Sequence, residues 1–442
     1  MHGERSTVHR GFHARSTLDG PLRRNMRCAI PLHPSLDADS PAYLEDLYRF
    51  YVDVRQGGPV VRTPTGVGLI GRYTDVARAF RDPIFIKEAV NGSAVTRVAG
   101  GGSAPASALS AEFSRWMLFR DPPAHTRLRG LVTKAFTPHV AEAMAPRIHA
   151  IVDQLLDAVE GRGGMEAIAD YAYPLPFMVI GELIGLSMEG ASKSREWTAA
   201  IARALDPTGR PEDVVTASEA LVSLQRYIKP QIDERRNHPR DDLLSRLISA
   251  EEQGGTLSEP ELISNVTLLF GAGHETTLNL IGNGLLALLR NPDQLERLRA
   301  EPELAQNAVE ELLRFDAPVQ FVQRWVREDT EFSGVEMRAG ERVLLLIGAA
   351  NRDPEVFPDP DRLDLGRSNV RHLSFSAGPH YCVGAALARL ESRIALTSAI
   401  ERYPTLRAGP GKVSWNTNAL FHGVRSLPVT WEGGADHGTA LA

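Results

Sequence analysis

Cysteine is nearly absent from this chain: only Cys28 and Cys382 occur in 442 residues. Two cysteines cannot build the disulfide framework on which many small secreted proteins depend. Their scarcity fits a protein of the reducing cytoplasm. It also favours one reactive or metal-ligating cysteine over a structural pair.

Long apolar runs and a strong net charge are missing as well. No uninterrupted apolar stretch approaches the ~20 residues that span a bilayer, and no apolar segment follows the N-terminus as a signal peptide requires. The formal net charge of -6 gives no overall basic surface for nucleic acid. The sequence therefore predicts a soluble protein that partners neither a membrane nor a nucleic acid.

The N-terminal segment differs from the rest of the chain. Residues 1–27 carry six arginines and few apolar side chains. This composition resembles a transit peptide, but the periodic pattern is missing, so we predict a disordered tail or a stretch upstream of a true start at Met26. No break in composition and no internal repeat divides the remainder, so one large domain is possible although the length would allow two or three.

The hydrophobic pattern predicts a mainly α protein. Most of residues 121–403 have helical periodicity, whereas Pro59–Ile70 is β-branched and punctuated by Gly and Pro, as in a strand and turn. Two stretches break the pattern and are predicted to be mobile loops. They are Val98–Ala108, rich in Gly, Ala and Ser, and Asp206–Glu212, which contains two prolines.

The longest helix is predicted over Ser258–Asn291. Ser258 and Glu261 form a capping-box pattern, Pro260 lies in the first turn, and Pro292 follows the end. The middle of the helix is apolar on nearly every side. We therefore expect it to pass through the centre of the protein.

The sequence GAGHETT, residues 271–277, interrupts this helix with glycines and polar side chains. A glycine inside a helix costs ~1 kcal/mol relative to alanine, and Thr276 can hydrogen-bond the carbonyl oxygen of Ala272. The residues alone leave two interpretations open. The segment is either a functional opening or a packing notch for a crossing helix, with His274 and Glu275 exposed to solvent.

Cys382 stands where a loop rich in Gly and Pro meets a helix: FSAGPHYCVG, residues 375–384, precedes the helical pattern AALARLESRIALTSAI. The positive end of the helix dipole and the free N–H groups there stabilise a thiolate, the form of cysteine that ligates metals. A buried, inert cysteine is the plain alternative. A zinc site with His372 and His380 is the other, although no CxxC completes four ligands.

Four segments together resemble the cytochrome P450 family. FSAGPHYCVG is similar to its haem-binding signature, Phe-x-x-Gly-x-His/Arg-x-Cys-x-Gly, and AGHET, residues 272–276, to its oxygen-activating segment. ELLR, residues 311–314, matches the family's Glu-x-x-Arg, whose charges share one helix face. DPPAHTRLR, residues 121–129, is similar to the Asp-Pro-Pro-Glu-His-Thr-Arg-Leu-Arg of bacterial members. The resemblance extends over roughly Pro41–Trp431.

The resemblance implies the cytochrome P450 fold, with residues 28–442 forming a single haem domain: a large helical part with a long central helix, and a small β-rich region. Cys382 would be the thiolate ligand of the iron of haem b (iron protoporphyrin IX). Glu311, Arg314 and Arg362 would form a structural charge network. The other residues implied at the cofactor are His125, Arg129, Arg324, His372 and His380, as donors to the haem propionates, and Ala272, Phe375, Gly378 and Gly384.

Two positions depart from the family pattern. Ser376 stands where glycine is usual, beside the proximal sulfur, and can alter hydrogen bonding to that sulfur and hence the redox potential. Leu363 replaces the usual phenylalanine.

The family's chemistry implies a haem-thiolate monooxygenase that inserts one oxygen atom from O2 into a small, largely apolar substrate of specialised metabolism. Hydroxylation is expected, with epoxidation or oxidative coupling as alternatives. Glu275 and Thr276 would relay protons, which favours dioxygen over peroxide as oxidant. A non-catalytic haem sensor or electron carrier is the alternative from another class, and it would not need Glu275 and Thr276.

Electrons are expected from a separate ferredoxin and ferredoxin reductase, because the chain contains no reductase or flavin segment. The P450 itself is expected to be a monomer. Candidates for docking an acidic ferredoxin, with ordinary solvated helix faces as the alternative, are Arg127, Lys134, Arg371, Arg389 and Arg393.

Candidate substrate contacts come from three segments, and the predicted loops are expected to act as a lid. Core packing is the alternative for each candidate. The residues are Leu269 and Phe270 on the long helix, Val319 and Val322 after the Glu-x-x-Arg helix, and Leu420 and Phe421 near the C-terminus.

Overall fold

The computed structural model describes residues 43–88, 104–189, 193–206, 210–252 and 257–432. The predicted tail, residues 1–27, and Cys28 lie outside the described residues. Most of the described chain is helical. The α-helices are α1 (Tyr43–Gly57), α2 (Tyr73–Ala79), α4 (Ala104–Phe113), α5 (Ala124–Thr133), α6 (Pro138–Ala143), α7 (Ala145–Asp157), α8 (Pro174–Ile184), α9 (Ser194–Ala204), α10 (Pro211–Asn237), α11 (Leu243–Glu252), α12 (Glu259–Arg290), α13 (Pro292–Ala300), α14 (Ala305–Phe315), α15 (Ile347–Asn351) and α16 (Ala385–Arg402).

Short helical turns and strands complete the fold. The turns are η3 (Met117–Phe119), η4 (Lys134–Phe136), η5 (Glu160–Arg162), the π-helix η6 (Ala167–Ala172), η8 (Pro302–Leu304) and η9 (Gly378–His380). The strands are β1 (Val61–Arg62), β2 (Gly68–Ile70), β3 (Phe85–Ile86), β4 (Gly164–Glu166), β5 (Phe321–Val326), β6 (Thr330–Phe332), β7 (Val335–Met337), β8 (Arg342–Leu346), β9 (Arg407–Ala408), β10 (Ser414–Trp415), β11 (Val424–Ser426) and β12 (Pro428–Thr430).

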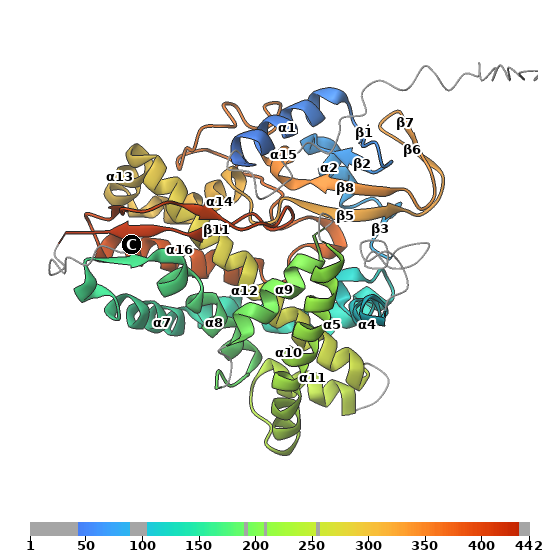
Figure 1. The fold of residues 1–442 in the computed structure, drawn as a ribbon, viewed down its shortest axis with the longest axis horizontal. Helices are drawn as coiled ribbons and strands as arrows, with labels where there is room; N and C mark the ends of the chain where they lie inside the picture. The colour runs from blue at the N-terminus through green and yellow to red at the C-terminus, as the bar shows by residue number, and fades with distance from the viewer. Residues whose placement is uncertain (1–42, 89–103, 190–192, 207–209, 253–256, 433–442) are drawn as a thin grey trace, which may run out of the picture.

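The largest sheet has the order β1–β2–β8–β5–β3. The pair β2–β8 is parallel and the other neighbours are antiparallel, with Val61 opposite Leu69 in the β1–β2 hairpin. The strand and turn predicted over Pro59–Ile70 are thus confirmed. Figure 1 shows this sheet with α1, α2 and α15 on one side of the molecule, beside the larger helical body.

The long helix α12 crosses the middle of the protein and packs against α8, α10, α14 and α16. It runs from Glu259 to Arg290, and the predicted capping box is present: the hydroxyl of Ser258 accepts from the N–H of Glu261, whose carboxylate accepts from the N–H of Ser258. Most residues between Leu262 and Leu288 are buried. The prediction of a central helix is confirmed.

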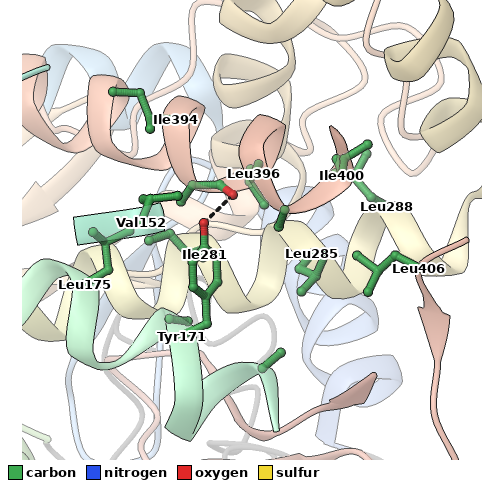
Figure 2. Packing of buried hydrophobic residues seen from close by; sticks show 14 of the residues in the cluster. Val152, Tyr171, Leu175, Ile281, Leu285, Leu288, Ile394, Leu396, Ile400 and Leu406 are labelled. Atoms are coloured by element: carbon green, nitrogen blue, oxygen red, sulfur yellow. Dashed lines mark hydrogen bonds between the residues drawn. The ribbon is translucent and has the colours of Figure 1, made fainter. Parts of the chain in front are cut away.

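The largest hydrophobic cluster lies where α7, α8, α12 and α16 meet. Figure 2 shows Ile281 and Leu285 of α12 facing Leu396 and Ile400 of α16. The hydroxyl of Tyr171 donates to the carbonyl oxygen of Ala395 at 2.7 Å, so this buried polar group is satisfied within the core. The cluster fixes α12 against α16, the helix that follows Cys382.

Both predicted loops are partly wrong. Within Val98–Ala108, residues 98–103 lie outside the described residues, but Ala104–Ala108 open α4. Within Asp206–Glu212, Asp206 is buried and its carboxylate accepts from the N–H of Ala419 at 2.6 Å, while Pro211 and Glu212 begin α10. The Gly, Pro and Ser content of these stretches suggested loops. Composition alone does not reveal that their Ala and Pro residues form the first turn of a helix.

One stretch, Ala167–Ile184, is long and apolar enough to cross a bilayer by length and composition, and 61% of it is buried inside the fold. It comprises η6 and α8, which pack against α12. The core helices of globular proteins have the same composition.

Candidate functional site

A cavity of about 600 Å³ is bounded by the middle of α12 and by the loop that carries Cys382. Segments far apart in the chain meet on its wall, which is mainly apolar. The predicted site residues on this wall are Cys382, Phe375, His380 and Gly384 from the Cys382 loop, Ala272, Glu275 and Thr276 from α12, His125 and Arg129 from α5, and Arg324 from β5.

Cys382 lies between η9 and α16, and Gly384 is the N-cap of α16. Its side chain opens onto the cavity. Burial within the fold raises the pKa of the thiol, whereas the N–H of Gly384 and the guanidinium groups of Arg129 and Arg389 lower it. The helix N-terminus thus favours the thiolate as expected, but desolvation outweighs it, and a positive metal ion would reverse that balance.

The loop before Cys382 turns sharply. The N–H of Cys382 donates to the carbonyl oxygen of Phe375 at 2.9 Å. Ser376 and Gly378 have φ of 63° and 70°, in the left-handed region that favours glycine. Gly378 does not line the cavity; a Cβ there would lie 2.6 Å from the carbonyl oxygen of Phe80, so this position requires glycine. The Oγ of Ser376 is buried and has no hydrogen-bond partner among the described residues.

Gly271 and Gly273, the two glycines of the GAGHETT segment of α12, differ in their surroundings. A Cβ on Gly273 would lie 2.9 Å from Ile180 of α8, whereas a Cβ on Gly271 would have no neighbour nearer than Thr198 at 3.9 Å. Gly273 therefore forms a packing notch against α8, and both glycines border the cavity. The hydroxyl of Thr276 donates to the carbonyl oxygen of Ala272 at 2.9 Å, as predicted. The packing notch is thus present at Gly273, and the functional opening stays a prediction.

His274 and Glu275 are not exposed to bulk solvent. His274 is fully buried, with its ring edge-on to Tyr173 and Phe177, and burial lowers its pKa to about 4. Glu275 lines the cavity, and burial raises the pKa of its carboxyl group while the charge of Arg195 lowers it. The guanidinium of Arg195 lies 4.6 Å from the ring centre of Tyr173. Only Glu275 of the two can take part in chemistry in the cavity.

Cations and imidazoles gather at one end of the cavity. The rings of His125 and His380 lie 4.1 Å apart, and the Nδ1 of His125 and the Nε2 of His380 are buried without a hydrogen-bond partner among the described residues. Arg129 donates to the carbonyl oxygen of Tyr381 at 2.6 Å. Arg324 is almost fully buried, and this burial lowers its pKa to about 10. Such a cluster requires an anion.

His372 does not line the cavity with this cluster, and its contact with a propionate stays a prediction. Its Nε2 lies 3.1 Å from the carboxylate of Glu310, and its Nδ1 accepts from the N–H of Ser374 at 3.1 Å. Glu310 also holds Arg389 through two hydrogen bonds of 2.6 and 3.0 Å. Both partners lower the pKa of the Glu310 carboxyl to about 2, although burial opposes them. Both ring nitrogens of His372 are therefore engaged by the protein.

The Glu-x-x-Arg pair is buried, and its third member is Arg367, not Arg362. Arg314 donates to Glu311 at 2.7 and 2.8 Å, and both side chains are fully buried. The Nε of Arg367 donates to the same carboxylate at 3.1 Å. Arg362 is exposed and contributes only its carbonyl oxygen, which accepts from Arg314 at 3.1 Å and from Arg367 at 3.2 Å. Leu363, in place of the family's phenylalanine, is buried.

Comparison with known proteins decides the family. A family model described as Cytochrome P450 matches residues 212–412. Cytochrome P450 107B1 of Saccharopolyspora erythraea is 42% identical over 403 residues, covering 90% of this chain and 98% of that protein. The chain belongs to the cytochrome P450 family.

Two further P450s agree over nearly their whole length. The cytochrome P450 monooxygenase PikC of Streptomyces venezuelae is 38% identical over 429 residues, covering 94% of this chain and 99% of that protein. The solved structure of P450BioI with an acyl carrier protein ligated to hexadec-9Z-enoic acid has a TM-score of 0.82 and 37% identity, covering 88% of this chain and all of that one. The predicted fold is confirmed, and this P450 is a haem-thiolate monooxygenase.

The site fits haem, the cofactor of this family. The cavity offers the thiol of Cys382 as a ligand, beside a wall of α12. The orphaned nitrogens of His125 and His380, with the guanidinium groups of Arg129 and Arg324, suit the two carboxylates of a haem. The contact of each residue with the cofactor remains a prediction.

Five of the six predicted substrate contacts lie on the cavity wall: Leu269, Val319, Val322, Leu420 and Phe421. Phe270 does not; it is fully buried and packs against the rings of Phe177 and Tyr227. Several wall residues had not been predicted, because an aromatic or aliphatic side chain carries no sequence signal that separates a cavity wall from the core. They include Phe113, Trp116, Phe119, Ile201, Leu205 and Phe321.

Charged residues were also missed, among them Lys87 on the cavity wall, Glu310 and Arg367. Glu310 directly precedes Glu311, and two adjacent carboxylates on a helix were the signal available. Lys87 follows the short strand β3, and nothing in its neighbours indicates burial.

Proposed function

We propose that this P450 hydroxylates a small, largely apolar organic molecule of specialised metabolism, with epoxidation or oxidative coupling as related outcomes. One observation carries the proposal: Cys382 and the Glu275–Thr276 pair reach the same, mainly apolar cavity from different elements. When bound, the haem supplies the iron that activates dioxygen, with a thiolate ligand that favours O–O cleavage.

Glu275 and Thr276 are assigned the delivery of protons to the cavity. The hydroxyl of Thr276 donates to Ala272, so its oxygen remains free to accept a hydrogen bond from water or from a bound group. Burial raises the pKa of Glu275, and a carboxyl group whose pKa lies nearer neutrality both takes up and releases protons at the working pH. This pair suits a relay from solvent to the haem side of the cavity.

The apolar wall supports a substrate with a long hydrocarbon part. Among the relatives, the polyketide biosynthesis cytochrome P450 PksS of Bacillus subtilis is 43% identical over 317 residues, and the P450BioI structure holds an acyl chain. The aromatic residues Phe113, Trp116 and Phe119 contact one another on this wall. They would exclude water and orient an acyl or polyketide chain.

Electrons are proposed to come from a ferredoxin and its reductase. Among the candidate docking residues, Arg127 pairs with Glu261 at 2.5 Å and Arg389 with Glu310, so these two serve the fold. Lys134 and Arg371 are exposed and Arg393 is half-buried. These three remain the candidates for contact with an acidic ferredoxin. The protein is proposed to act as a monomer in the cytoplasm.

The alternative function, a haem sensor or electron carrier, is not favoured, because the relatives are monooxygenases. A buried acid beside a hydroxyl on the cavity wall would serve no purpose in such a protein.

Replacing Thr276 tests the proton relay. The substrate is a fatty acid or macrolactone that shifts the spin state of the ferric protein. NAD(P)H consumption and product formation are measured in the same reaction. In Thr276→Ala, we expect the rate of product formation to fall about 100-fold, the usual contribution of a positioned proton-transfer group. NAD(P)H should still be consumed, with hydrogen peroxide as the product.

The control for this test is Thr276→Ser, which keeps the hydroxyl and should keep the wild-type ratio of product to NAD(P)H. An unchanged ratio in Thr276→Ala would rule out the relay.

A further inference from the structure

We propose that Lys87 is a haem-binding residue, a third cation that pairs with a haem propionate beside Arg129 and Arg324. No part of the family resemblance pointed to it. The proposal rests on the haem cofactor of the family and on the position, burial and charge of this side chain.

The fold places Lys87 at the cationic end of the cavity. It directly follows β3, whose Ile86 is opposite Trp325 on β5, the residue next to Arg324. The N–H of Lys87 donates to both oxygens of Asp121, at 3.1 and 3.0 Å. Asp121 precedes α5, the helix of His125 and Arg129. The backbone of Lys87 is thereby fixed to both segments that carry the predicted propionate donors.

The side chain of Lys87 is buried and lines the cavity. Its Nζ lies 5.9 Å from the ring centre of Phe119 and makes no ion pair or side-chain hydrogen bond with any described residue. The negative charge of Asp121 favours the protonated form of Lys87, but both oxygens of Asp121 already accept hydrogen bonds from backbone N–H groups. A buried ammonium without a direct partner is unfavourable unless a ligand provides one.

The surroundings specify the charge of that ligand. Lys87 acts electrostatically on His125, His380 and Arg324, all of which line the same end of the cavity. The carboxylates of Asp121 and of Glu88, the residue after Lys87, already accept hydrogen bonds from backbone N–H groups. Three cations and two imidazoles therefore call for more than one negative charge. The two propionates of a haem whose iron is held by Cys382 meet this demand. A substrate carboxylate is the competing occupant.

The rate at which the protein loses haem distinguishes a haem propionate from a substrate carboxylate as the partner of Lys87. Purified holoprotein is mixed with excess apomyoglobin, and the transfer of haem is followed by the Soret band. We expect Lys87→Met to lose haem about tenfold faster than the wild type or more, because an anion is left without its cation. Lys87→Arg, which keeps the charge, should restore retention. Lys134→Met removes an exposed lysine and should change the rate less than about twofold.

Binding of dodecanoic acid and of neutral dodecanol, measured by the spin-state shift, forms the second arm. If Lys87→Met weakens binding of the acid alone and leaves haem transfer unchanged, the lysine serves substrate and the proposal is wrong. Lys87→Gln is measured in the same way if Lys87→Met does not fold. If the folded neutral variant, Lys87→Met or Lys87→Gln, loses haem at the same rate as the wild type, the proposal is overturned.

Discussion

At the scale of single residues, the sequence motifs located the candidate site. The side chains that pair with its charged residues could not be predicted, because they are set by the path of the backbone. Cys382, Glu275 and Thr276 were found from local pattern, and they meet at one cavity. The choice between Arg362 and Arg367 as partner of Glu311 could not be made from sequence, because the two lie five positions apart in an irregular segment. Nor does anything local in the sequence indicate that Glu310 faces His372.

His274 gives a prediction about pH. Burial lowers its pKa in the folded protein to about 4, against the usual 6.5. Below pH 6.5 the unfolded chain takes up a proton that the folded protein does not, so stability falls between pH 6.5 and pH 4 and levels off below that. From pH 7.5 to pH 5 the free energy of unfolding should fall by about 2 kcal/mol through this residue alone.

In His274→Phe, which keeps an aromatic ring against Tyr173 and Phe177, this part of the pH dependence should disappear. The measurement is urea unfolding of both proteins at pH 7.5 and pH 5, followed by far-UV circular dichroism. If the two proteins lose the same stability between these pH values, His274 is not held neutral.

At the scale of elements, periodicity and caps predicted α12 to within a residue, whereas composition failed for α4. The capping box of Ser258 and Glu261 is a local interaction, visible in four residues of sequence. The start of α4 follows a stretch rich in Gly and Ser, and its Ala residues favour a helix only once Leu109 and Phe113 are buried against the core. Tertiary packing therefore decided that element.

The contact between α8 and α12 predicts that replacing Gly271 and Gly273 by alanine has opposite effects on stability. Gly273→Ala would drive a methyl group into Ile180 and should cost about 1–3 kcal/mol of stability by overpacking. Gly271→Ala meets open space and should be neutral or stabilising by up to about 1 kcal/mol, because alanine has the higher helix propensity. Thermal unfolding followed by circular dichroism compares them. A larger loss in Gly271→Ala than in Gly273→Ala would contradict this packing.

At the scale of the whole molecule, the class of fold was predictable because the long central helix and the motifs occur in the order of the family. The mixed sheet was not, since β2 pairs with β8 across more than half of the chain and such long-range pairing has no local signal. That residues 28–442 form one domain, and that the protein is a monomer, stay predictions. The division of labour is nevertheless clear: α16 and its preceding loop present Cys382, and α12 presents Glu275 and Thr276 to the same cavity.

Ligation of the haem iron by the Cys382 thiolate is the central claim. The absorption spectrum of the purified protein, reduced and bound to carbon monoxide, tests it most directly, with Cys382→His for comparison. The wild type should show the strongly red-shifted Soret band of a thiolate-ligated haem, and the variant a band at the position of histidine-ligated haem proteins. A wild-type band without the red shift, or a red-shifted band that survives in Cys382→His, would contradict the claim.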